Sequence, residues 1–550
     1  MDYTLCGKRN SATVSKRALA LSRYNYGAMR TPVLAWIFFI VTAGFTAVVV
    51  PLGEGFDEPY HLGYVQLVAQ TGNLPVGPDS RLSVELDEFM SRHPIGWRFH
   101  QIYPALYSQE EYWQQPDVER REIDAAFRDL RFWGQYQDGA SEFGKQYESH
   151  QAPLYYVLSA PVFLIGSKLF SFPDTFLLIR LWSALLASAV VPLSYLVAKE
   201  VSRSQAVANA VTMLVAMFPG IYPDVVRVSN DALAVPLMAA IFLALARYSG
   251  RRETLILSFL LLAGLSTKAI FIPILAAVVA VLLWWRERTA AMKLVMGTTL
   301  GWIWYIRNVW ITGSVTGLPE TVVANTSISS SLAALGMINW TDLFRLTAVS
   351  HIWMGNWSLL QYRSWIYETV FVLFVIGIAG FMAYLRKSKS RSVRAFIVIY
   401  VVFCASLVYY ATQVFQQTSL SVIQGWYLSP LVPIEALAFV LGIHFLFGQR
   451  IMTWVVAFVA LCFLAMLIYG TGFIAAPYYS GLTDHAPSGH LRAYHPDSGD
   501  ASTMGARLTR LHAWLPISAP LYLALGVLAS GFILICVFVK DVRWLSESSH

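Results

Sequence analysis

Two carboxylates and a histidine stand together where an apolar stretch of the chain ends. In GEGFDEPYH, residues 53–61, Asp57, Glu58 and His61 follow an apolar run that ends at Val50. A carboxylate placed beside a reacting hydroxyl group can take its proton as a general base. A helix cap with an acidic first turn and an early Pro59 explains one carboxylate without any catalysis. It does not explain His61 one turn later, so the segment is a candidate catalytic site.

Further polar side chains recur beside other apolar runs. They are His150 and Gln151; Asp224, Arg227, Asn230 and Asp231; Lys268; Arg307 and Asn308; and Gln424, Trp426 and Tyr427. Ionisable groups near a membrane are costly, and are usually paired or functional. Structural alternatives remain open for several of them. Asn230 and Asp231 are suited to capping a helix, Lys268 to reaching the interface along its apolar stem, and Arg307 to anchoring a span.

The composition is that of a polytopic membrane protein. The chain has 550 residues, of which 56% are hydrophobic, 14% aromatic and only 13% charged; its mean hydropathy is +0.52. A charge fraction of roughly 25% is usual in soluble domains. The formal net charge of +7 could suggest nucleic-acid binding, but the basic residues form short clusters between apolar runs, as in cytoplasmic loops.

Neither cysteines nor histidines form a metal-binding pattern. Cys6, Cys404, Cys462 and Cys536 lie in the N-terminal tail or in apolar runs, which excludes a disulfide framework as an interpretation. The stretch HLRAYHPDSGD, 490–500, contains two histidines and two aspartates, but their spacing is loose for zinc. We therefore expect no metal site and no cofactor.

Apolar runs of about 17–25 residues cross a bilayer. We expect twelve, near residues 33–51, 177–198, 205–221, 232–248, 254–268, 269–285, 291–308, 366–385, 394–412, 427–447, 452–472 and 517–539. The basic residues before the first run, and the lack of a cleavage signal after it, predict a retained first helix with a cytoplasmic start. The predicted fold is thus all-α, with about twelve transmembrane helices.

The apolar stretch 153–166 decides the topology. If it lies along the outer surface, every later basic cluster, including RKSKSRSVR at 386–394, faces the side of the basic N-terminus. If it spans, all those clusters move to the opposite side, against the positive-inside rule. We therefore expect a juxtamembrane helix at 153–166, with both termini cytoplasmic.

This topology divides the chain and collects its polar segments on one side. The expected units are a basic cytoplasmic tail, 1–32; a catalytic transmembrane module, 33–308, with the outer loop 52–176; a second outer loop, 309–365; and a C-terminal transmembrane module, 366–550, with an outer loop at 473–516. A short outer segment lies at 413–426. In the first loop, REIDAAFRDLRFW is typical of an amphipathic helix, which indicates a folded loop.

The order of these segments resembles the GT-C superfamily of membrane glycosyltransferases, such as protein O-mannosyltransferases and aminoarabinose transferases. The similar segments are FDEPYHLGYVQLVAQTGNLP, SHQAPLYYVLSAPVFLIG, IRLWSALLASAVVPLSYLVAKEV, PGIYPDVVRVSNDALAV, STKAIFIPILAAV, WYIRNVWITGSVTG and QGWYLSPLVPIEAL. Together they cover about residues 35–445. Two departures stand out: Ala152-Pro153 replaces a Pro-Pro pair, and Trp426 stands where many bacterial relatives have Arg.

The resemblance implies transfer of a sugar from a polyprenyl-phosphate donor to an extracytoplasmic glycan, lipid or protein. It implies that Asp57 is the general base of an inverting displacement, with Glu58 beside it in the catalytic segment. We expect Lys268 and Arg307 to bind the leaving phosphate as charge-assisted donors. The other expected substrate-binding residues are His61, His150, Gln151, Asn230, Asp231, Gln424 and Tyr427. The expected location is the bacterial inner (plasma) membrane, with the active site on the extracytoplasmic face.

Three other interpretations remain open. A transporter or flippase of lipid-linked saccharides should carry ionisable groups in mid-membrane and broken helices, whereas here the charges lie at the outer ends of the runs. A non-catalytic subunit of an envelope assembly would tolerate loss of Asp57. A metal-dependent transferase would bind a divalent ion with Asp57, Asn230 and Asp231, for which few carboxylates converge.

Overall fold

The computed structural model describes residues 30–77, 79–136, 144–318 and 327–547. Within these ranges the regular structure is helical, and extended pairing is limited to isolated bridges such as Arg81 with Lys145. The predicted all-α fold class is therefore confirmed. Most of the predicted cytoplasmic tail, 1–32, and Cys6 lie outside the described residues.

Apolar helices long enough to cross a membrane make up much of the described chain. Six stretches qualify by length and composition: α2 (Arg30–Val49), α9 with α10 (Phe172–Ser202), α20 (Ser364–Lys387), α21 (Arg391–Thr418), the continuous helical stretch Gly425–Tyr479, and Ala519–Arg543 within α25 (Ala519–Glu547). Shorter apolar helices are α8 (Leu154–Leu169), α11 (Gln205–Met217), α13 (Asp231–Ala246), α15 (Phe271–Trp284) and α18 (Ile328–Met337). The chain is a multi-pass membrane protein, and the count of twelve spans remains a prediction.

Three predicted spans have a different form in the structure. The run 291–308 is divided into α16 (Arg288–Gly297), the 3₁₀ turn η3 (Thr299–Trp302) and α17 (Ile303–Thr312). The Thr298 hydroxyl donates to the carbonyls of Leu294 and Val295, and such back-bonding competes with regular helix geometry. The runs 427–447 and 452–472 belong to α22 (Val432–Leu467), which bends at Gly448. Gly448 has φ 75° and ψ 176°, a conformation available to glycine.

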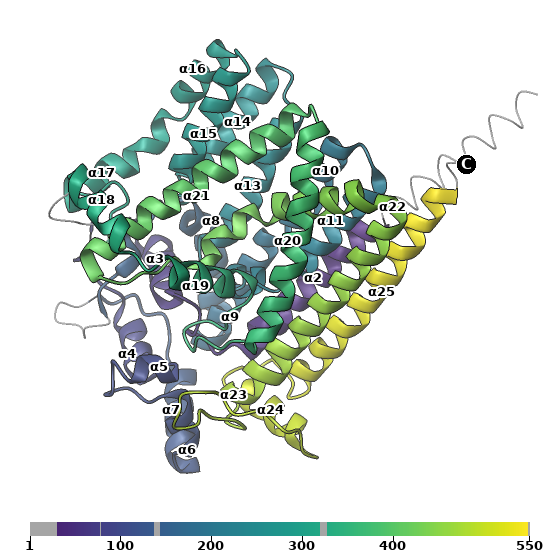
Figure 1. The fold of residues 1–550 in the computed structure, drawn as a ribbon. Coiled ribbons are helices and arrows are strands. Elements are labelled where there is room, and N and C mark those ends of the chain that lie inside the picture. The colour runs from purple at the N-terminus through teal and green to yellow at the C-terminus, as the bar shows by residue number, and fades with distance from the viewer. Residues whose placement is uncertain (1–29, 78, 137–143, 319–326, 548–550) are drawn as a thin grey trace, which may run out of the picture.

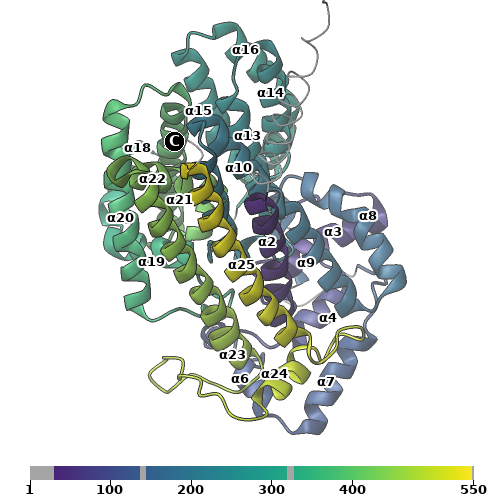
Figure 2. The ribbon, with the colours of Figure 1, turned by 90° about the vertical axis from the view of Figure 1, so that its right-hand side faces the viewer.

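The core lies where the first, middle and last helices meet. The residues of α11 are buried along its whole length, against α2, α10 and α22. The helices α2 and α25 pack side by side although they come from opposite ends of the described chain (Figures 1 and 2). The paired helices α20 and α22 complete this side of the bundle.

The polar first loop is folded, as the sequence predicts. It contains α3 (Glu58–Thr71), α4 (Val84–Arg92), α5 (Trp97–His100), α6 (Gln109–Gln114), α7 (Asp117–Asp129) and the 3₁₀ turn η2 (Tyr147–His150). The predicted amphipathic helix is α7, which ends at Asp129 instead of Trp133. In Figure 1, α4–α7 gather at the lower end of the molecule with α23 (Ala476–Tyr479) and α24 (Asp500–Leu508). The α14 (Arg251–Leu265), α15 and α16 group lies at the upper end.

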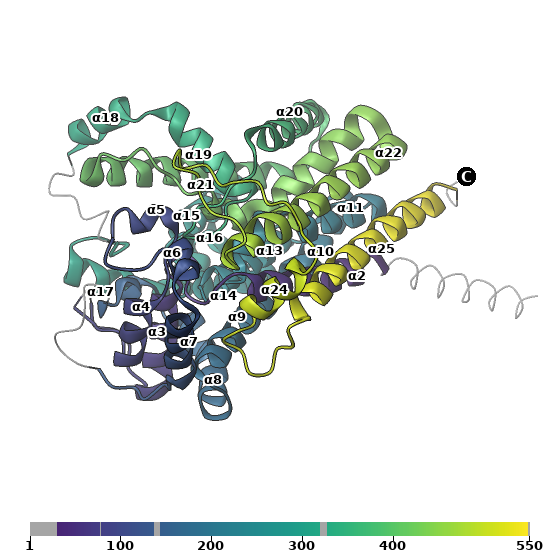
Figure 3. The same ribbon diagram turned by 90° about the horizontal axis from the view of Figure 1, so that it is seen from below.

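The stretch 153–166 forms α8, which packs on α3 and α9. One side of α8 is buried through Tyr155, Tyr156 and Phe163, whereas Val157 and Ile165 are exposed. The helix lies at the edge of the molecule beside the first-loop helices (Figure 3). An exposed apolar face is suited to a lipid boundary. Its position relative to a bilayer remains a prediction.

One buried carboxylate joins three distant segments of the predicted outer side. The Glu54 carboxylate accepts hydrogen bonds from the Ser358 hydroxyl, from the Tyr479 hydroxyl at 3.3 Å and from the Gln109 amide at 3.5 Å. Burial raises the pKa of Glu54 to about 7. The first loop, the second loop and the end of the long α22–α23 stretch are therefore tied together next to the GEGFDEPYH segment.

Candidate functional site

Asp57 lies at the turn that joins α2 to α3. Its backbone is left-handed, with φ 57° and ψ 13°, a region in which Asp is one of the few tolerated side chains. Asp57 is the residue before the first turn of α3, yet its carboxylate makes no capping hydrogen bond. The side chain is half-buried and interacts electrostatically with Arg227. Helix capping, the structural alternative for this residue, is therefore not what the carboxylate does.

Glu58 points the other way, into the protein. Its carboxylate accepts two hydrogen bonds of 2.6 Å from Arg180 and a third, of 2.9 Å, from the backbone N–H of Val228. The backbone N–H groups of Gly53 and Gly55 donate to the same carboxylate. Arg180 in turn donates to the carbonyls at the end of α2. We expected Glu58 in the catalytic segment. These contacts instead describe an anchor that fixes the turn holding Asp57.

Four buried charges lie next to this turn. Nη2 of Arg227 donates to Asp224 and to Asp231, at 2.9 Å each, and the Lys268 ammonium group donates to the other oxygen of Asp231. Arg227 also lies over the ring of Phe56, 5.5 Å from its centroid. Burial and then the charge of Asp231 raise the pKa of Asp224. The segment 224–231, the residue Lys268 and the Asp57 turn therefore form one electrostatic unit.

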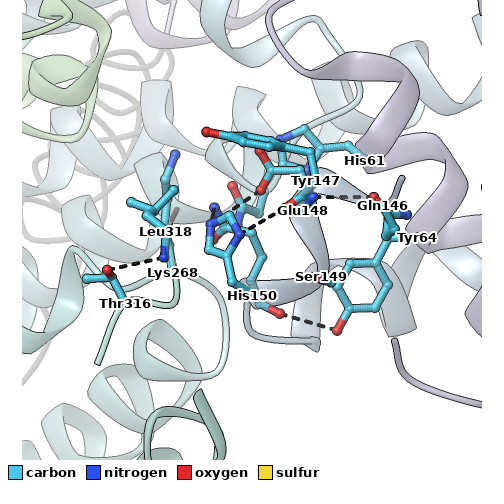
Figure 4. A network of polar contacts seen from close by, with 12 residues as sticks. His61, Tyr64, Gln146, Tyr147, Glu148, Ser149, His150, Lys268, Thr316 and Leu318 are labelled. Carbon is cyan, nitrogen blue, oxygen red and sulfur yellow. Dashed lines mark hydrogen bonds and ion pairs between the residues drawn. The ribbon is translucent and has the colours of Figure 1, made fainter. Parts of the chain in front are cut away.

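A second polar network joins the histidines (Figure 4). Glu148 Oε1 lies 3.8 Å from Nε2 of His61, and Glu148 Oε2 lies 3.7 Å from Nε2 of His150. His61 Nδ1 is 2.8 Å from the Tyr156 hydroxyl of α8. The Gln151 amide nitrogen is 3.1 Å from His150 Nε2, and its oxygen accepts from Asn230 at 2.9 Å. Asn230 thus does not cap α13 but continues this network.

The partners of His150 determine where its proton lies. Nδ1 faces the carbonyl of Tyr147 at 3.1 Å, and a carbonyl only accepts, so the neutral ring carries its proton on Nδ1. Nε2 of His150 then accepts a hydrogen bond from the Gln151 amide. Glu148 Oε2 also faces this nitrogen, so an ionised Glu148 would place two lone pairs opposite each other. A proton shared between Glu148 and His150 would remove this repulsion. Burial raises the pKa of Glu148 to about 7, which favours that shared proton. Burial, followed by the charges of Arg227 and Lys268, lowers the pKa of His61 and keeps its ring neutral.

Arg307 contacts the backbone of the segment that carries Glu148 and His150. Its guanidinium group donates to the carbonyl of Ser149 at 3.2 Å, to the Asn308 side chain at 2.9 Å and to the carbonyl of Pro75. Asn308 and Trp304 both donate to the carbonyl of His150. The end of α17 therefore holds the Tyr147–His150 turn in place, and the described donors of Arg307 are used by protein groups.

The late segment 424–427 closes the site. Trp426 stacks on Phe56 with a centroid distance of 4.1 Å, and the Lys268 ammonium group lies 5.6 Å from the ring centroid of Tyr427. Gln424 precedes the 3₁₀ helix Gly425–Leu431, and its buried side-chain oxygen has no hydrogen-bond partner among the described residues. Trp426 thus packs on Phe56, the residue that precedes Asp57.

The structure therefore brings the predicted site residues into one neighbourhood, from loops far apart in the sequence. It also includes groups for which the sequence predicts no role. Arg227 and Asp224 stand out in the sequence only because they lie between two apolar runs. Arg180 is a single charge within an apolar run, a pattern that could have identified it. Glu148 stands in the polar run QYESHQ, where nothing distinguishes it from a surface residue. Whether any of these side chains touches a substrate stays a prediction.

The described part of the chain contains no cluster of side chains arranged to bind a metal ion. No group of three or more His, Cys, Asp or Glu side chains there could hold a metal ion. The two histidines beside Glu148 instead face a protonatable carboxylate.

Comparisons with known proteins give distant likenesses. No protein-family model matches the chain, and no curated protein sequence matches it significantly. Among solved structures, ArnT from Cupriavidus metallidurans bound to undecaprenyl phosphate is similar with 14% identity and a TM-score of 0.37, covering 87% of this chain and 74% of ArnT. The Archaeoglobus fulgidus oligosaccharyltransferase, in complex with zinc and sulfate, is similar with 13% identity and a TM-score of 0.36. That match covers 68% of this chain and 48% of the archaeal protein, so the matched region spans about half of its length. At these TM-scores the likeness is too distant to assign a fold or an activity.

Proposed function

We propose that this protein is a membrane glycosyltransferase that moves a sugar from a polyprenyl-phosphate carrier to an acceptor on the extracytoplasmic side. The observation that carries the proposal is the placement of Asp57. A half-buried carboxylate in a left-handed turn lies beside the buried cations Arg227 and Lys268, where apolar helices meet the folded loops. A carboxylate that takes the acceptor's proton and cations that stabilise the departing phosphate are what such a displacement requires.

The reaction is a single displacement at the anomeric carbon of the donor. The acceptor oxygen forms the new bond to that carbon, and its proton passes to Asp57. The bond between the anomeric carbon and the phosphate oxygen breaks, and both electrons leave with the polyprenyl phosphate. The configuration at the anomeric carbon is inverted. Lys268 and Arg227 stabilise the charge that develops on the departing phosphate.

The apolar helices suit a carrier with a long hydrocarbon chain. Α lipid-linked donor stays in the bilayer, so only its headgroup needs to reach the polar network at the ends of the helices. Acceptors arrive from the side of the loops, where α4–α7 lie. The acceptor class, whether glycan, lipid or protein, does not follow from these contacts.

The test is turnover of the donor by the purified full-length protein in nanodiscs. A polyprenyl-phosphate sugar should be converted to free polyprenyl phosphate, with the sugar found on an added acceptor fraction from envelope extracts. A transporter or flippase would instead move the intact donor between leaflets without cleaving it. Intact donor in every acceptor fraction, together with leaflet exchange, would contradict the proposal.

A further inference from the structure

A helix of the second outer loop holds both ends of the segment that closes the site. This helix is α19 (Trp340–Ile352), and the segment comprises residues 425–435. At its beginning, the backbone N–H of Gly425 donates to the hydroxyl of Ser350 at 2.7 Å. At its end, Oε2 of Glu435 lies 2.9 Å from Nε2 of His351. Two neighbouring residues of one helix turn therefore close this segment into a loop.

The attachment at Gly425 is made by the backbone and leaves no room for a side chain. A Cβ atom there would lie 2.1 Å from the carbonyl oxygen of Thr347 and 2.3 Å from the backbone nitrogen of His351. The Thr347 hydroxyl also donates to the carbonyl of Ile423 at 3.0 Å. The chain that enters the 3₁₀ helix Gly425–Leu431 is therefore fixed on the last turns of α19.

Side chains of the candidate site lie between these two attachments. The ring of Trp426 stacks on Phe56, the residue before Asp57. The ring of Tyr427 faces the ammonium group of Lys268 at 5.6 Å. A shift of residues 425–435 would therefore move the two rings that flank the Asp57 turn and the buried cations.

The attachment at Glu435 is arranged to hold opposite charges. Glu435 lies in the first turn of α22 and His351 in the last turn of α19, and these helix ends stabilise an anion and a cation respectively. The other oxygen of Glu435 accepts a hydrogen bond of 3.1 Å from the hydroxyl of Tyr400. The side chains of His351 and Glu435 are only 12% and 14% exposed, so solvent screens the pair weakly.

Other titratable groups also face this pair. Asp224 acts electrostatically on His351, and Tyr400 and Cys404 of α21 act on Glu435. Glu435 keeps its hydrogen bond from Tyr400 whether or not His351 is charged. The part of this attachment that changes with pH is therefore the proton on His351.

The neighbours of His351 favour its charged form. Burial alone lowers the pKa of His351, but the Glu435 carboxylate, the Gly425 backbone and Asp224 outweigh burial, and the pKa lies above its ordinary value of 6.5. His351 is therefore mostly protonated at pH 6.5 and loses its proton as the pH rises further.

We propose that His351 is a positioning residue: its protonated form fastens residues 425–435 and thereby holds Trp426 in place. The inference rests on the proposed function, since its consequence is a pH dependence of sugar transfer. When His351 is charged, the ion pair with Glu435 holds the segment against α19. When the proton is lost, only a neutral donor remains for Glu435, so the segment is held less tightly and transfer slows.

The experiment measures sugar transfer and the thermal unfolding midpoint of the full-length protein in nanodiscs, from about pH 6 to about pH 8.5. The substrates are a saturating polyprenyl-phosphate sugar and the acceptor fraction from envelope extracts. His351→Gln keeps an N–H donor for Glu435 but carries no charge. The ratio of the wild-type rate to the His351→Gln rate should fall about threefold to tenfold across this range, the difference between a charged and a neutral hydrogen bond.

This ratio isolates His351 from the other groups. Carboxyls that titrate in the same range, such as Glu54 and Glu148, are present in both proteins and cancel. The difference in unfolding midpoint between the wild type and His351→Gln should also shrink as the pH rises. A group with a raised pKa contributes stability that is fully present below its ordinary value, here 6.5, and is lost above it.

The matched control is a second buried histidine pair. Nδ1 of His512 lies 3.0 Å from the carboxylate of Asp174 in the first turn of α9, and both side chains are buried. His512→Gln removes this pair but leaves residues 425–435 attached to α19. Its transfer rate relative to the wild type should therefore stay constant with pH, whatever its effect on the unfolding midpoint.

The outcomes separate the two proposals. Wild-type protein that transfers no sugar at any pH would remove the proposed function itself. Transfer by the wild type with a constant ratio to His351→Gln would overturn only the positioning role, even where the unfolding midpoint depends on pH. An equal change of the ratio for His512→Gln would attribute the effect to overall stability and also overturn that role.

A second variant keeps the test decisive if His351→Gln does not fold. Glu435→Gln removes the carboxylate that does most to raise the pKa of His351, so the decline in transfer should move to lower pH. A folded Glu435→Gln protein with the wild-type pH profile would contradict the proposed pair. Folding is checked by gel filtration.

Discussion

Three carboxylates within five residues have three different environments. Glu54 is buried among the hydroxyls and amide of other segments, Glu58 is saturated by Arg180 and backbone N–H groups, and Asp57 alone lies half-buried beside a cation cluster. Residue type and sequence position are nearly the same for all three. Their partners, which come from distant segments, set the three carboxylates apart, and the proposed role of general base falls to Asp57.

Glu54 predicts a pH dependence of stability. Burial raises its pKa from 4.5 to about 7, so between these values the folded protein holds a proton that the unfolded chain has released. Stability from this group is therefore fully present below about pH 4.5 and is lost as the pH rises towards 7. Glu54→Gln stays neutral and should flatten this part of the profile. Thermal unfolding midpoints from pH 5 to pH 7.5 measure it.

The matched control for Glu54 is the exposed Glu122 of α7. Glu122→Gln should leave the slope of unfolding midpoint against pH as it is in the wild type. Equal slopes for wild type and Glu54→Gln would show that the carboxyl at the three-segment junction does not titrate in this window.

At the scale of residues, the sequence predicted which side chains lie together better than it predicted what each of them contacts. Asp57, His61, Asn230 and Lys268 converge because topology alone puts their loops at one end of the bundle. Glu148 could not be identified in this way, since its burial comes from the packing of α3 against the turn Tyr147–His150. The hydrogen bonds of Arg227 and Arg307 likewise come from contacts that no spacing reveals.

Among the helices, the start of α3 is fixed from outside. Arg180 of α9 reaches Glu58 across 122 residues of sequence and also holds the last carbonyls of α2. The left-handed turn at Asp57 is thus clamped between two helix ends. A strained or unusual backbone conformation persists where the surrounding structure over-determines it.

Removing one partner of this clamp should be severe. Arg180→Met leaves the buried Glu58 carboxylate without its cation, and breaking a buried pair in this way typically costs about 3–5 kcal/mol. The double variant Glu58→Met with Arg180→Met removes both charges and should recover part of that loss. Chemical unfolding in detergent measures the difference. A double variant less stable than Arg180→Met would contradict the role of Glu58 as the clamp's counter-charge.

The apolar runs predicted where helices lie in the sequence. They did not predict where a helix breaks or bends. The break at Thr298 and the bend at Gly448 arise inside runs whose composition alone suits a span. At Thr298 a hydroxyl group bonds back to helix carbonyls, and at Gly448 the backbone has a positive φ. Each local feature interrupts a helix within a run that is uniformly apolar by hydropathy.

For the molecule as a whole, the predicted outer segments do meet. Trp113 of α6 donates to the carbonyl of Tyr479 at 3.0 Å, and Glu110 pairs with His485 at 2.5 Å, so the first and last loops share one end. The sequence predicted this through the positive-inside rule. It also predicted that α8 lies along the outer surface, a prediction on which the side of every later loop depends.

Cysteine labelling tests that topology. In a chain whose Cys6, Cys404, Cys462 and Cys536 are replaced by Ala, Lys168→Cys in the last turn of α8 should react with an impermeant maleimide in intact cells. Lys389→Cys, between α20 and α21, should react only after the cells are opened. Both lysines are exposed in the structure, so a difference in labelling would reflect the side of the membrane and not burial within the protein. Reaction of Lys168→Cys only in opened cells would show that α8 spans.

The most direct test of the account is the transfer rate of Asp57→Asn. Asn tolerates the left-handed conformation as Asp does, so folding and polyprenyl phosphate binding should survive. Loss of the proton acceptor should lower transfer from a polyprenyl-phosphate sugar about a hundredfold to ten-thousandfold. Asp129→Asn, at the exposed end of α7, is the control and should transfer at the wild-type rate. Near-normal transfer by Asp57→Asn would contradict Asp57 as the general base and, with it, the mechanism proposed for this protein.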